Sequence, residues 1–199
     1  MSEPRETRAP RRADVTETEF VGGVEKRELF LVDHDPAWAS TYAAHEARIR
    51  EALGDAAVAI EHIGSTSVPG LAAKPIVDIL VTVHDITAEE DYLDPLVDAG
   101  YPLRVREPGH RLVRTKERDT HIHLFAFDDP AVDDYLIFRD RLRVDDADRQ
   151  LYEDTKRELV THEWADMNDY ADAKTDVIEQ IKTRARAASG RGSSGPRRA

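Results

Sequence analysis

The chain has no cysteine among its 199 residues. This absence excludes disulfide bonds, thiolate metal ligands and a cysteine nucleophile. Long apolar segments are missing too: no run approaches the roughly 18 residues that would span a bilayer. The first residues, MSEPRETRAPRRADVTE, also lack the apolar core of a secretory signal. We therefore expect a cytoplasmic protein with no membrane partner.

Lysine is scarce in this chain, which is acidic overall. The 40 aspartates and glutamates outnumber the 28 lysines and arginines and give a formal net charge of -12, which argues against nucleic acid as a partner. An acidic, arginine-rich composition is typical of halophilic proteins, so we attribute the charge to the solvent rather than to the substrate. The few lysines then become candidates for specific roles: Lys26, Lys74, Lys116, Lys156, Lys174 and Lys182.

Composition divides the chain into one domain and two tails. Residues 1–22 are charged and aperiodic, and residues 188–199 are rich in glycine, serine and arginine, so neither end can bury enough apolar area to become ordered. We expect both tails to be flexible. A length of 199 residues suits a single domain, which we place at residues 23–187.

Hydrophobic periodicity predicts an α/β (α+β) protein. Apolar residues at helical spacing, and runs rich in β-branched residues, distinguish helices from strands. The predicted strands are 58–64, 74–83, 110–116 and 120–127. The predicted helices are 36–53, 87–99, 133–144, 146–160 and 168–186. The pattern therefore indicates a mixed sheet followed by a helical C-terminal segment.

The segment EHIGSTSVPGLAAKPIVDILVTV, residues 61–83, carries the strongest functional signal. A Gly64-Ser65 turn follows a predicted strand, where a backbone without a side chain can approach a phosphate and N–H groups can bind an anion. Asp78 stands in the next apolar strand, and its carboxylate could hold Mg²⁺ bridging the same phosphates. The alternative is a tight turn and a structural aspartate at a strand end.

Further motifs accompany this segment. They are HIGSTSVPGLAAKPIVDI, DHDPAW, DAGY, HIHLF, YLIFRDRLR and the pairs Tyr152–Lys156 and Tyr170–Lys174. Together they resemble the GrpB-like family, also designated UPF0157, over about residues 29–187. The resemblance implies a nucleotidyltransferase-like mixed β-sheet flanked by helices. It also implies a reaction in which strand carboxylates hold Mg²⁺ while an acceptor hydroxyl attacks the α-phosphate of a nucleotide.

One metal ligand of that implied site is missing. The second carboxylate should stand two residues after the first, on the same strand face, and here that position is Leu80. His121 and His123 alternate on a predicted strand and share a face, so we expect Asp78, His121 and His123 as metal ligands. Imidazole favours Mn²⁺ or Zn²⁺ over Mg²⁺.

The histidines and acids near the turn leave alternatives open. His123 could instead act as a general base beside Asp78, making these two the predicted catalytic residues. Glu61 and His62, just before the turn, are other substitutes for the missing acid. Two histidines on one face could equally be hydrogen-bonded members of a half-polar sheet.

The predicted phosphate site combines the turn with cationic side chains. Lysine presents a compact charge suited to phosphate oxygens. The predicted ligands of a nucleoside triphosphate are Gly64, Ser65, Thr66, Lys74, Lys156, Lys174 and Arg114. Arg111 and Arg139 are secondary candidates. Alternatively, Lys156 and Lys174 lie on the surface with their stems packed on the tyrosines four residues earlier.

Two functions follow from these observations, and a purely structural role is a third alternative. The first is a metal-dependent nucleotidyl or phosphoryl transferase acting on a small molecule or nucleotide, with Mg²⁺ or Mn²⁺. The second is a binding module that keeps the phosphate site but, with Leu80, performs no turnover. No P-loop motif is present, and Ser65 lacks the Gly-x-Ser-x-Gly context of a hydrolase nucleophile. Some GrpB-like domains are fused to dephospho-CoA kinase, an association with coenzyme A metabolism. The sequence does not predict an oligomeric state.

Overall fold

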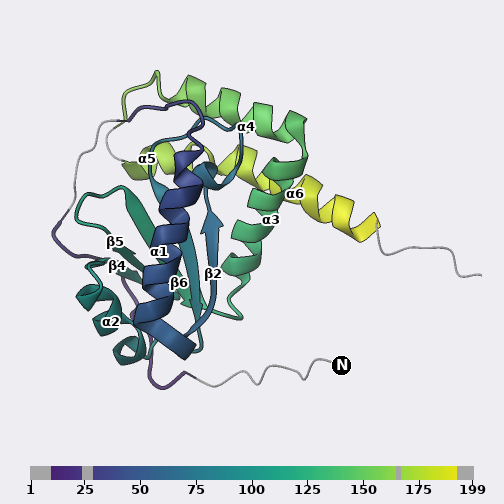
Figure 1. Cartoon of the computed structure of the whole chain (residues 1–199). Helices are drawn as coiled ribbons and strands as arrows, with labels where there is room; N and C mark the ends of the chain where they lie inside the picture. Colours follow the sequence, from purple (N-terminus) through teal and green to yellow (C-terminus); the bar gives the residue numbers. More distant parts are fainter. Residues whose placement is uncertain (1–9, 24–28, 165–166, 192–199) are drawn as a thin grey trace, which may run out of the picture.

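The computed structural model describes residues 10–23, 29–164 and 167–191, which form a mixed sheet covered by helices on both faces (Figure 1). The strands are β1 (Glu19–Phe20), β2 (Ala57–Ile63), β3 (Val77–Val83), β4 (Leu103–Glu107), β5 (His110–Arg114) and β6 (Thr120–Ala126). Their order in the sheet is β1-β4-β5-β6-β3-β2. Among these pairs only β3 and β6 run parallel. The predicted mixed α/β fold is confirmed.

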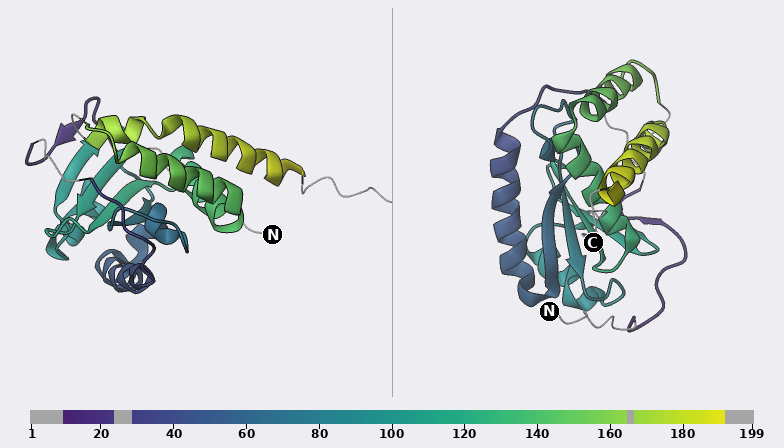
Figure 2. Two further views of the ribbon diagram at one scale, coloured as in Figure 1. Left: turned by 90° about the horizontal axis from the view of Figure 1, so that it is seen from above. Right: turned by 90° about the vertical axis from the view of Figure 1, so that its right-hand side faces the viewer.

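The helices form two layers, one on each side of the sheet (Figure 2). One layer holds α1 (Ala37–Leu53) and the short α2 (Leu93–Asp98). The opposite layer holds α3 (Pro130–Val144), α4 (Asp146–Leu159), α5 (Met167–Asp172) and α6 (Thr175–Arg191). The larger apolar core lies between the sheet and α1, because strand residues Ile79 and Ile122 pack there with Trp38 and Ile49.

Helix ends follow the local sequence. The Asp35 carboxylate accepts the Ala37 N–H at 2.8 Å at the start of α1, and α1 ends at Gly54, whose φ is +50°. Asp129 accepts the Ala131 N–H at 2.8 Å before α3, with Pro130 in its first turn. These side-chain caps satisfy backbone donors that a helix leaves without partners.

Several elements differ from those that the sequence predicts. Strands β1 and β4 were not predicted, and β4 joins β5 to form the antiparallel side of the sheet. The predicted helix 87–99 is replaced by a three-residue 3₁₀ turn, Glu89–Asp91, and the six-residue α2. The predicted helix 168–186 is divided into α5 and α6, with Lys174 between them.

The predicted flexible tails differ from the structure in part. Asp14 lies within hydrogen-bond distance of Arg111, at 2.5 Å, and also accepts the Gly109 N–H. Strand β1 pairs with β4, and Arg11 hydrogen-bonds to Asp91, so parts of the predicted N-terminal tail have defined contacts. At the other end α6 continues to Arg191. Residues 1–9 and 192–199 lie outside the described residues, as does Lys26.

His62, on β2, faces α1 and is buried. Its ring stacks on Tyr42 with centroids 4.7 Å apart and 6° between the planes, and its Nε2 lies 3.1 Å from the Thr66 hydroxyl. Burial, with Arg143 and Arg139 nearby, lowers the pKa of His62 to about 4, against the weaker opposing effect of Asp78. His62 is therefore a neutral core side chain, not a substitute for the missing acid.

This environment predicts a pH-dependent loss of stability. Below pH 6.5 the unfolded chain takes up a proton at His62 that the native chain takes up only near pH 4, so the free energy of unfolding falls as the pH drops through that window. The variant His62→Phe keeps the stacked ring and removes the proton. Between pH 7 and pH 5 we expect it to lose about 1–2 kcal/mol less stability than the wild type. Urea unfolding at the two pH values measures this difference, and equal losses would contradict it.

Candidate metal centre in a lysine-lined cavity

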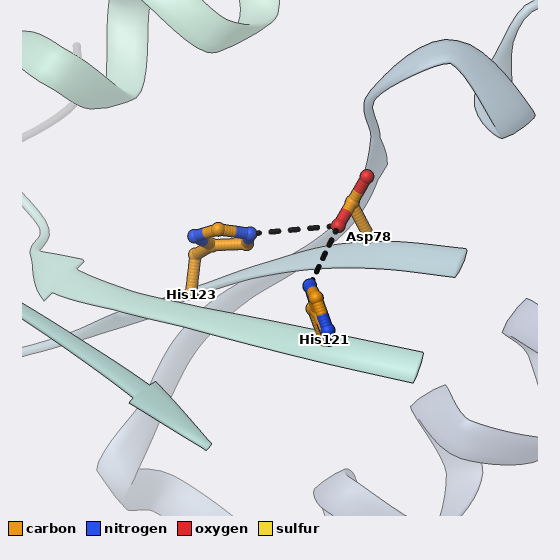
Figure 3. A group of neighbouring side chains, drawn as sticks. All are labelled: Asp78, His121 and His123. Atoms are coloured by element: carbon orange, nitrogen blue, oxygen red, sulfur yellow. Dashed lines mark ion pairs between the residues drawn. The ribbon is translucent and has the colours of Figure 1, made fainter. Parts of the chain in front are cut away.

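Asp78, His121 and His123 meet on the sheet face that is covered by α3 (Figure 3). Asp78 on β3 stands directly opposite His121 on β6 in the parallel register. The Asp78 Oδ1 atom lies 3.7 Å from His121 Nδ1 and 3.6 Å from His123 Nε2. One ligand atom from each of the three residues can be chosen so that all lie within 4.8 Å of one another. The three residues predicted as metal ligands are thus brought together.

Strand alternation explains why these side chains share a face with Leu80. Leu80 lies two residues after Asp78 and pairs with His123 across the strands. It is 1% exposed and packs with Ile63 and Phe125 beneath α3. The position of the missing carboxylate is therefore apolar core. His123, from the neighbouring strand, supplies the additional donor beside Asp78.

The charge state of Asp78 suits a cation. Burial favours its neutral form, but the contacts with His123 and the positive charges of His121 and Lys174 outweigh burial and hold the pKa of Asp78 below its usual value. About 29% of the side chain remains exposed. Asp78 is thus an ionised acceptor that a small ligand can reach.

A second pair of residues, absent from the sequence prediction, orients His123. His110 Nε2 lies 3.1 Å from His123 Nδ1, and His110 Nδ1 lies 2.5 Å from Glu107 Oε1. A contact that short to a carboxylate requires a proton on His110 Nδ1. Burial and His123 lower the pKa of His110, so His110 Nε2 acts as an acceptor for the His123 Nδ1–H. The remaining nitrogen of His123, Nε2, lies 3.6 Å from Asp78 Oδ1. In the neutral form of His123 this nitrogen carries the lone pair that a cation would use.

The arrangement of these three residues suits a divalent cation. When His123 is neutral, its Nε2 and the Asp78 carboxylate are two acceptors that face each other, and a cation between them would take the place of the proton. Ligand atoms on one metal ion with bonds of about 2.0–2.2 Å stand about 3–3.5 Å apart, close to the 3.7 and 3.6 Å that separate Asp78 Oδ1 from the two histidine nitrogens. One carboxylate and two imidazoles suit Mn²⁺ or Zn²⁺ better than Mg²⁺. The residues present fit such an ion.

The three residues open into a cavity of about 630 Å³ between the sheet and the α3–α6 layer. Ligand-binding cavities in proteins commonly have volumes of roughly 300–1,000 Å³. The predicted Gly64, Ser65 and Thr66 line it, as do aromatic side chains. The aromatic lining consists of Tyr135, Phe138, Tyr152 and Tyr170. The cavity therefore offers both polar groups and an apolar wall.

Four of the six lysines of the chain line this cavity. They are Lys74, Lys156, Lys174 and Lys182. The lining carboxylates are Asp78 and Asp134, and Lys182 is paired with Asp134 at 2.7 Å. Lys174 Nζ lies 4.3 Å from the Tyr170 ring centroid. An acidic protein thus gathers a positive surplus at one cavity, which attracts anions. Lys182 was not among the predicted phosphate ligands.

Other predicted cations lie elsewhere. Arg114 stands opposite His121 on β5 but outside the cavity lining. Arg111 is 2% exposed, and it pairs with Asp14 and Glu89 instead of facing the cavity. Arg139 pairs with Glu61 at 2.8 Å. The secondary candidates Arg111 and Arg139, and Glu61 with them, form structural ion pairs.

The position of the Asp78 side chain leaves no room for a side chain at residue 64, so glycine is required there. The φ of Gly64, +69°, lies in the region that favours glycine. A Cβ atom added there would lie 2.6 Å from Asp78 Oδ2 and 3.1 Å from its Cβ. The sequence predicts a glycine here for the approach of a phosphate, but its closest constraint within the structure is the Asp78 carboxylate.

The fold and cavity define a mixed α/β protein with a candidate metal centre, and comparison with known proteins identifies the family. The family model described as GrpB protein matches residues 28–184. The chain belongs to the GrpB family, as the motifs predicted. No helix among the described residues has both the length and the apolar character required to cross a bilayer.

Individual relatives agree with this assignment. A UPF0157 protein of Streptomyces coelicolor is 63% identical over 178 residues, covering 89% of this chain and 95% of that protein. The crystal structure of the conserved protein GrpB from Enterococcus faecalis has a TM-score of 0.69 at 29% identity, over 78% of this chain and 96% of that one. A dephospho-CoA kinase of Mycobacterium leprae is 31% identical over 177 residues, 72% of this chain and 43% of that protein. The shared fold is compatible with the nucleotidyltransferase superfamily.

The glycine geometry yields a matched pair of variants. Gly64→Ala adds backbone strain and a clash with Asp78, so we expect a loss of about 2–4 kcal/mol in the free energy of unfolding. Gly70 has a similar φ, +79°, but a Cβ there would meet nothing within 4 Å. Gly70→Ala should cost about 1 kcal/mol, from strain alone. Chemical denaturation of both variants measures the difference, and equal costs would show that Asp78 does not crowd Gly64.

Proposed function

We propose that this protein binds a nucleotide or a similar phosphorylated small molecule together with a divalent cation and transfers a nucleotidyl or phosphoryl group. The observation that carries the proposal is the convergence of Asp78, His121 and His123 with four lysines around one cavity. Anionic phosphates and a divalent cation are the ligands that such a mixed site suits. Family membership is consistent with this activity but names no substrate.

Each group has a distinct role in the proposal. Asp78, His121 and His123 hold the cation, which when bound polarises a phosphoryl oxygen and neutralises developing charge. Lys74 and Lys174 bind phosphate oxygens as point charges. The aromatic lining packs against the organic part of the substrate and excludes water. The chain's own contribution is thus to position the substrate and to stabilise charge.

A specific observation favours a second candidate function, binding without turnover. Leu80 is buried where a second carboxylate would stand, so the protein supplies a single negative charge to the cation. A nucleotide could then be bound through lysines alone. The dephospho-CoA kinase name of one relative makes coenzyme A or its precursors reasonable test ligands, although the match covers less than half of that protein.

Cooperative stabilisation by cation and nucleotide tests the proposal. With MnCl₂ and ATP each present at about 100 times its dissociation constant, we expect a joint stabilisation of about 2.7 kcal/mol or more. That corresponds to a rise of about 5–10 °C in Tm. The joint rise should exceed the sum of the two separate rises, and Asp78→Asn should remove the excess. Scanning calorimetry provides the measurement.

The matched control is Asp98→Asn, an exposed aspartate on α2, on the other side of the sheet, which should retain the excess. If ATP stabilises the wild type equally with and without Mn²⁺, the binding module is the correct function. If Mn²⁺ together with ATP or coenzyme A leaves Tm unchanged, both candidates are wrong.

The orientation of His123 should control metal affinity. His110→Phe keeps a ring stacked beside Phe125, at the position where His110 now lies 4.6 Å from that ring. It removes the acceptor for His123 Nδ1–H, and loss of such a supporting hydrogen bond typically costs about 10–100-fold in metal affinity. Titration calorimetry with Mn²⁺ or Zn²⁺ measures the change. His84→Phe, at an exposed position beyond the cavity, is the control, and equal affinities in the two variants would refute the role of His110.

A further inference from the structure

Lys156 and Ser65 form a polar pair at one wall of the cavity. Lys156 Nζ, on α4, lies 3.1 Å from Ser65 Oγ, in the turn after β2. The same nitrogen donates to the backbone carbonyl of Ala72. Both side chains line the cavity that holds Asp78. Two residues 91 positions apart in the sequence are thus joined by a direct hydrogen bond.

The surroundings of Lys156 are unusual for a lysine. The residue is 2% exposed, and no carboxylate in the described part of the chain lies within ion-pair distance of its Nζ. That atom lies 4.7 Å from the centroid of the Tyr152 ring. Burial, and secondarily the charge of Lys174, lower the pKa of Lys156 to about 7. Near neutral pH a substantial fraction of this side chain is therefore an uncharged amine, which can accept a proton.

Ser65 differs from its neighbour Ser67. The Ser67 hydroxyl donates to the Gly64 carbonyl at 2.6 Å and is outside the cavity lining. The Ser65 hydroxyl instead faces Lys156, and it also interacts with the phenol of Tyr152. It is half-buried and lines the cavity. Ser65 therefore presents its hydroxyl to the cavity, within hydrogen-bond distance of the buried amine of Lys156.

We propose that Ser65 and Lys156 are a nucleophile and its general base, with Ser65 Oγ attacking the phosphorus of the bound substrate. The proposal rests on the transferase function above and adds a covalent intermediate to it. As the Oγ–P bond forms, the hydroxyl proton moves to the neutral Nζ of Lys156. The P–O bond to the leaving phosphate breaks, and that phosphate departs with the bonding electrons.

The second half-reaction restores the enzyme. An acceptor alcohol attacks the same phosphorus and releases its own proton to solvent. The Oγ–P bond breaks, and the proton held on Lys156 returns to Oγ. Splitting one displacement into two in this way is the usual role of a serine activated by an adjacent base. A second carboxylate at the metal centre is then not needed to activate the nucleophile, because the nucleophile is Ser65 and Lys156 activates it.

Several charged or titratable groups face Lys156 and influence its protonation. Its own helix contributes Tyr152, Glu153 and Arg157, the link between α5 and α6 contributes Lys174, and the turn after β2 contributes the Ser65 hydroxyl. Glu153 opposes the other charges, but it accepts the Ala72 N–H at 2.9 Å and is not hydrogen-bonded to Lys156. The pKa of Lys156 therefore remains near 7, and its amine is partly uncharged at neutral pH.

A fluorophosphonate ester tests the pair without any need for nucleotide recognition, because serine attack expels fluoride and leaves a stable phosphonyl adduct on Oγ. Intact-mass spectrometry and peptide mapping should find the adduct on Ser65 of the wild type. The labelling rate should rise with pH, with a midpoint near 7. Ser65→Ala should remove the adduct, whereas Ser40→Ala, at an exposed serine on α1, should label like the wild type.

Two variants of Lys156 separate the base from a merely structural cation. Lys156→Arg keeps the charge and hydrogen-bond donors but cannot accept a proton near neutral pH, and Lys156→Met fills the buried volume without charge. Both should be labelled about 100-fold more slowly than the wild type, with folding verified by thermal melting. Normal labelling of Lys156→Arg, labelling of the wild type elsewhere than Ser65, or a pH-independent rate would overturn the proposal.

The test also separates this proposal from the function on which it rests. Labelling of Ser65 with the expected pH profile supports the pair even if Mn²⁺ and ATP fail to stabilise the protein jointly. Joint stabilisation without labelling of Ser65 would instead leave the transferase function standing and remove the covalent step.

Discussion

The parallel pairing of β3 with β6 is the constraint on which the candidate site depends. It sets Asp78 opposite His121 and Leu80 opposite His123. A shift by one residue would turn both histidines to the other face of the sheet. The apolar side chains on that face prevent such a shift because they are fully buried: Ile79, Val81, Ile122 and Leu124. The hydrophobic core beneath α1 thus determines the geometry of the polar site on the opposite face.

The two sides of the cavity contribute different chemistry. The sheet supplies the candidate metal ligands, whereas Lys156 and Lys174 come from α4 and from the link between α5 and α6. An apolar cluster joins the turn after β2 to this helical layer; it contains Val68, Leu71, Leu142, Tyr152, Val177 and Ile181. The carboxylate and imidazoles of the sheet therefore meet the lysine amines only when the sheet and the helical layer pack together. Burying a lysine such as Lys156 without a carboxylate partner costs stability, and a site that uses its uncharged form would explain why the cost is tolerated.

The sequence predicted the features that depend on local periodicity. Alternation along a strand placed His121 and His123 on one face, and motif resemblance identified the family and its mixed sheet. Contacts that depend on topology were not predictable, since nothing near His110 indicates that β5 would bring it beside His123. Lys182 resembles an ordinary surface lysine until α6 packs against α3. The break at Lys174 interrupts a sequence with good helical character, and tertiary packing determines where it falls.

The central claim is that Asp78, His121 and His123 bind one divalent cation. Anomalous diffraction from crystals soaked in MnCl₂ tests it most directly, because manganese scatters anomalously and its position is independent of any assumed chemistry. We expect one strong anomalous peak within about 2.0–2.3 Å of the Asp78 carboxylate and of a ring nitrogen from each histidine. If saturating Mn²⁺ gives no anomalous peak at this position, or gives a peak only at another site, the account is contradicted.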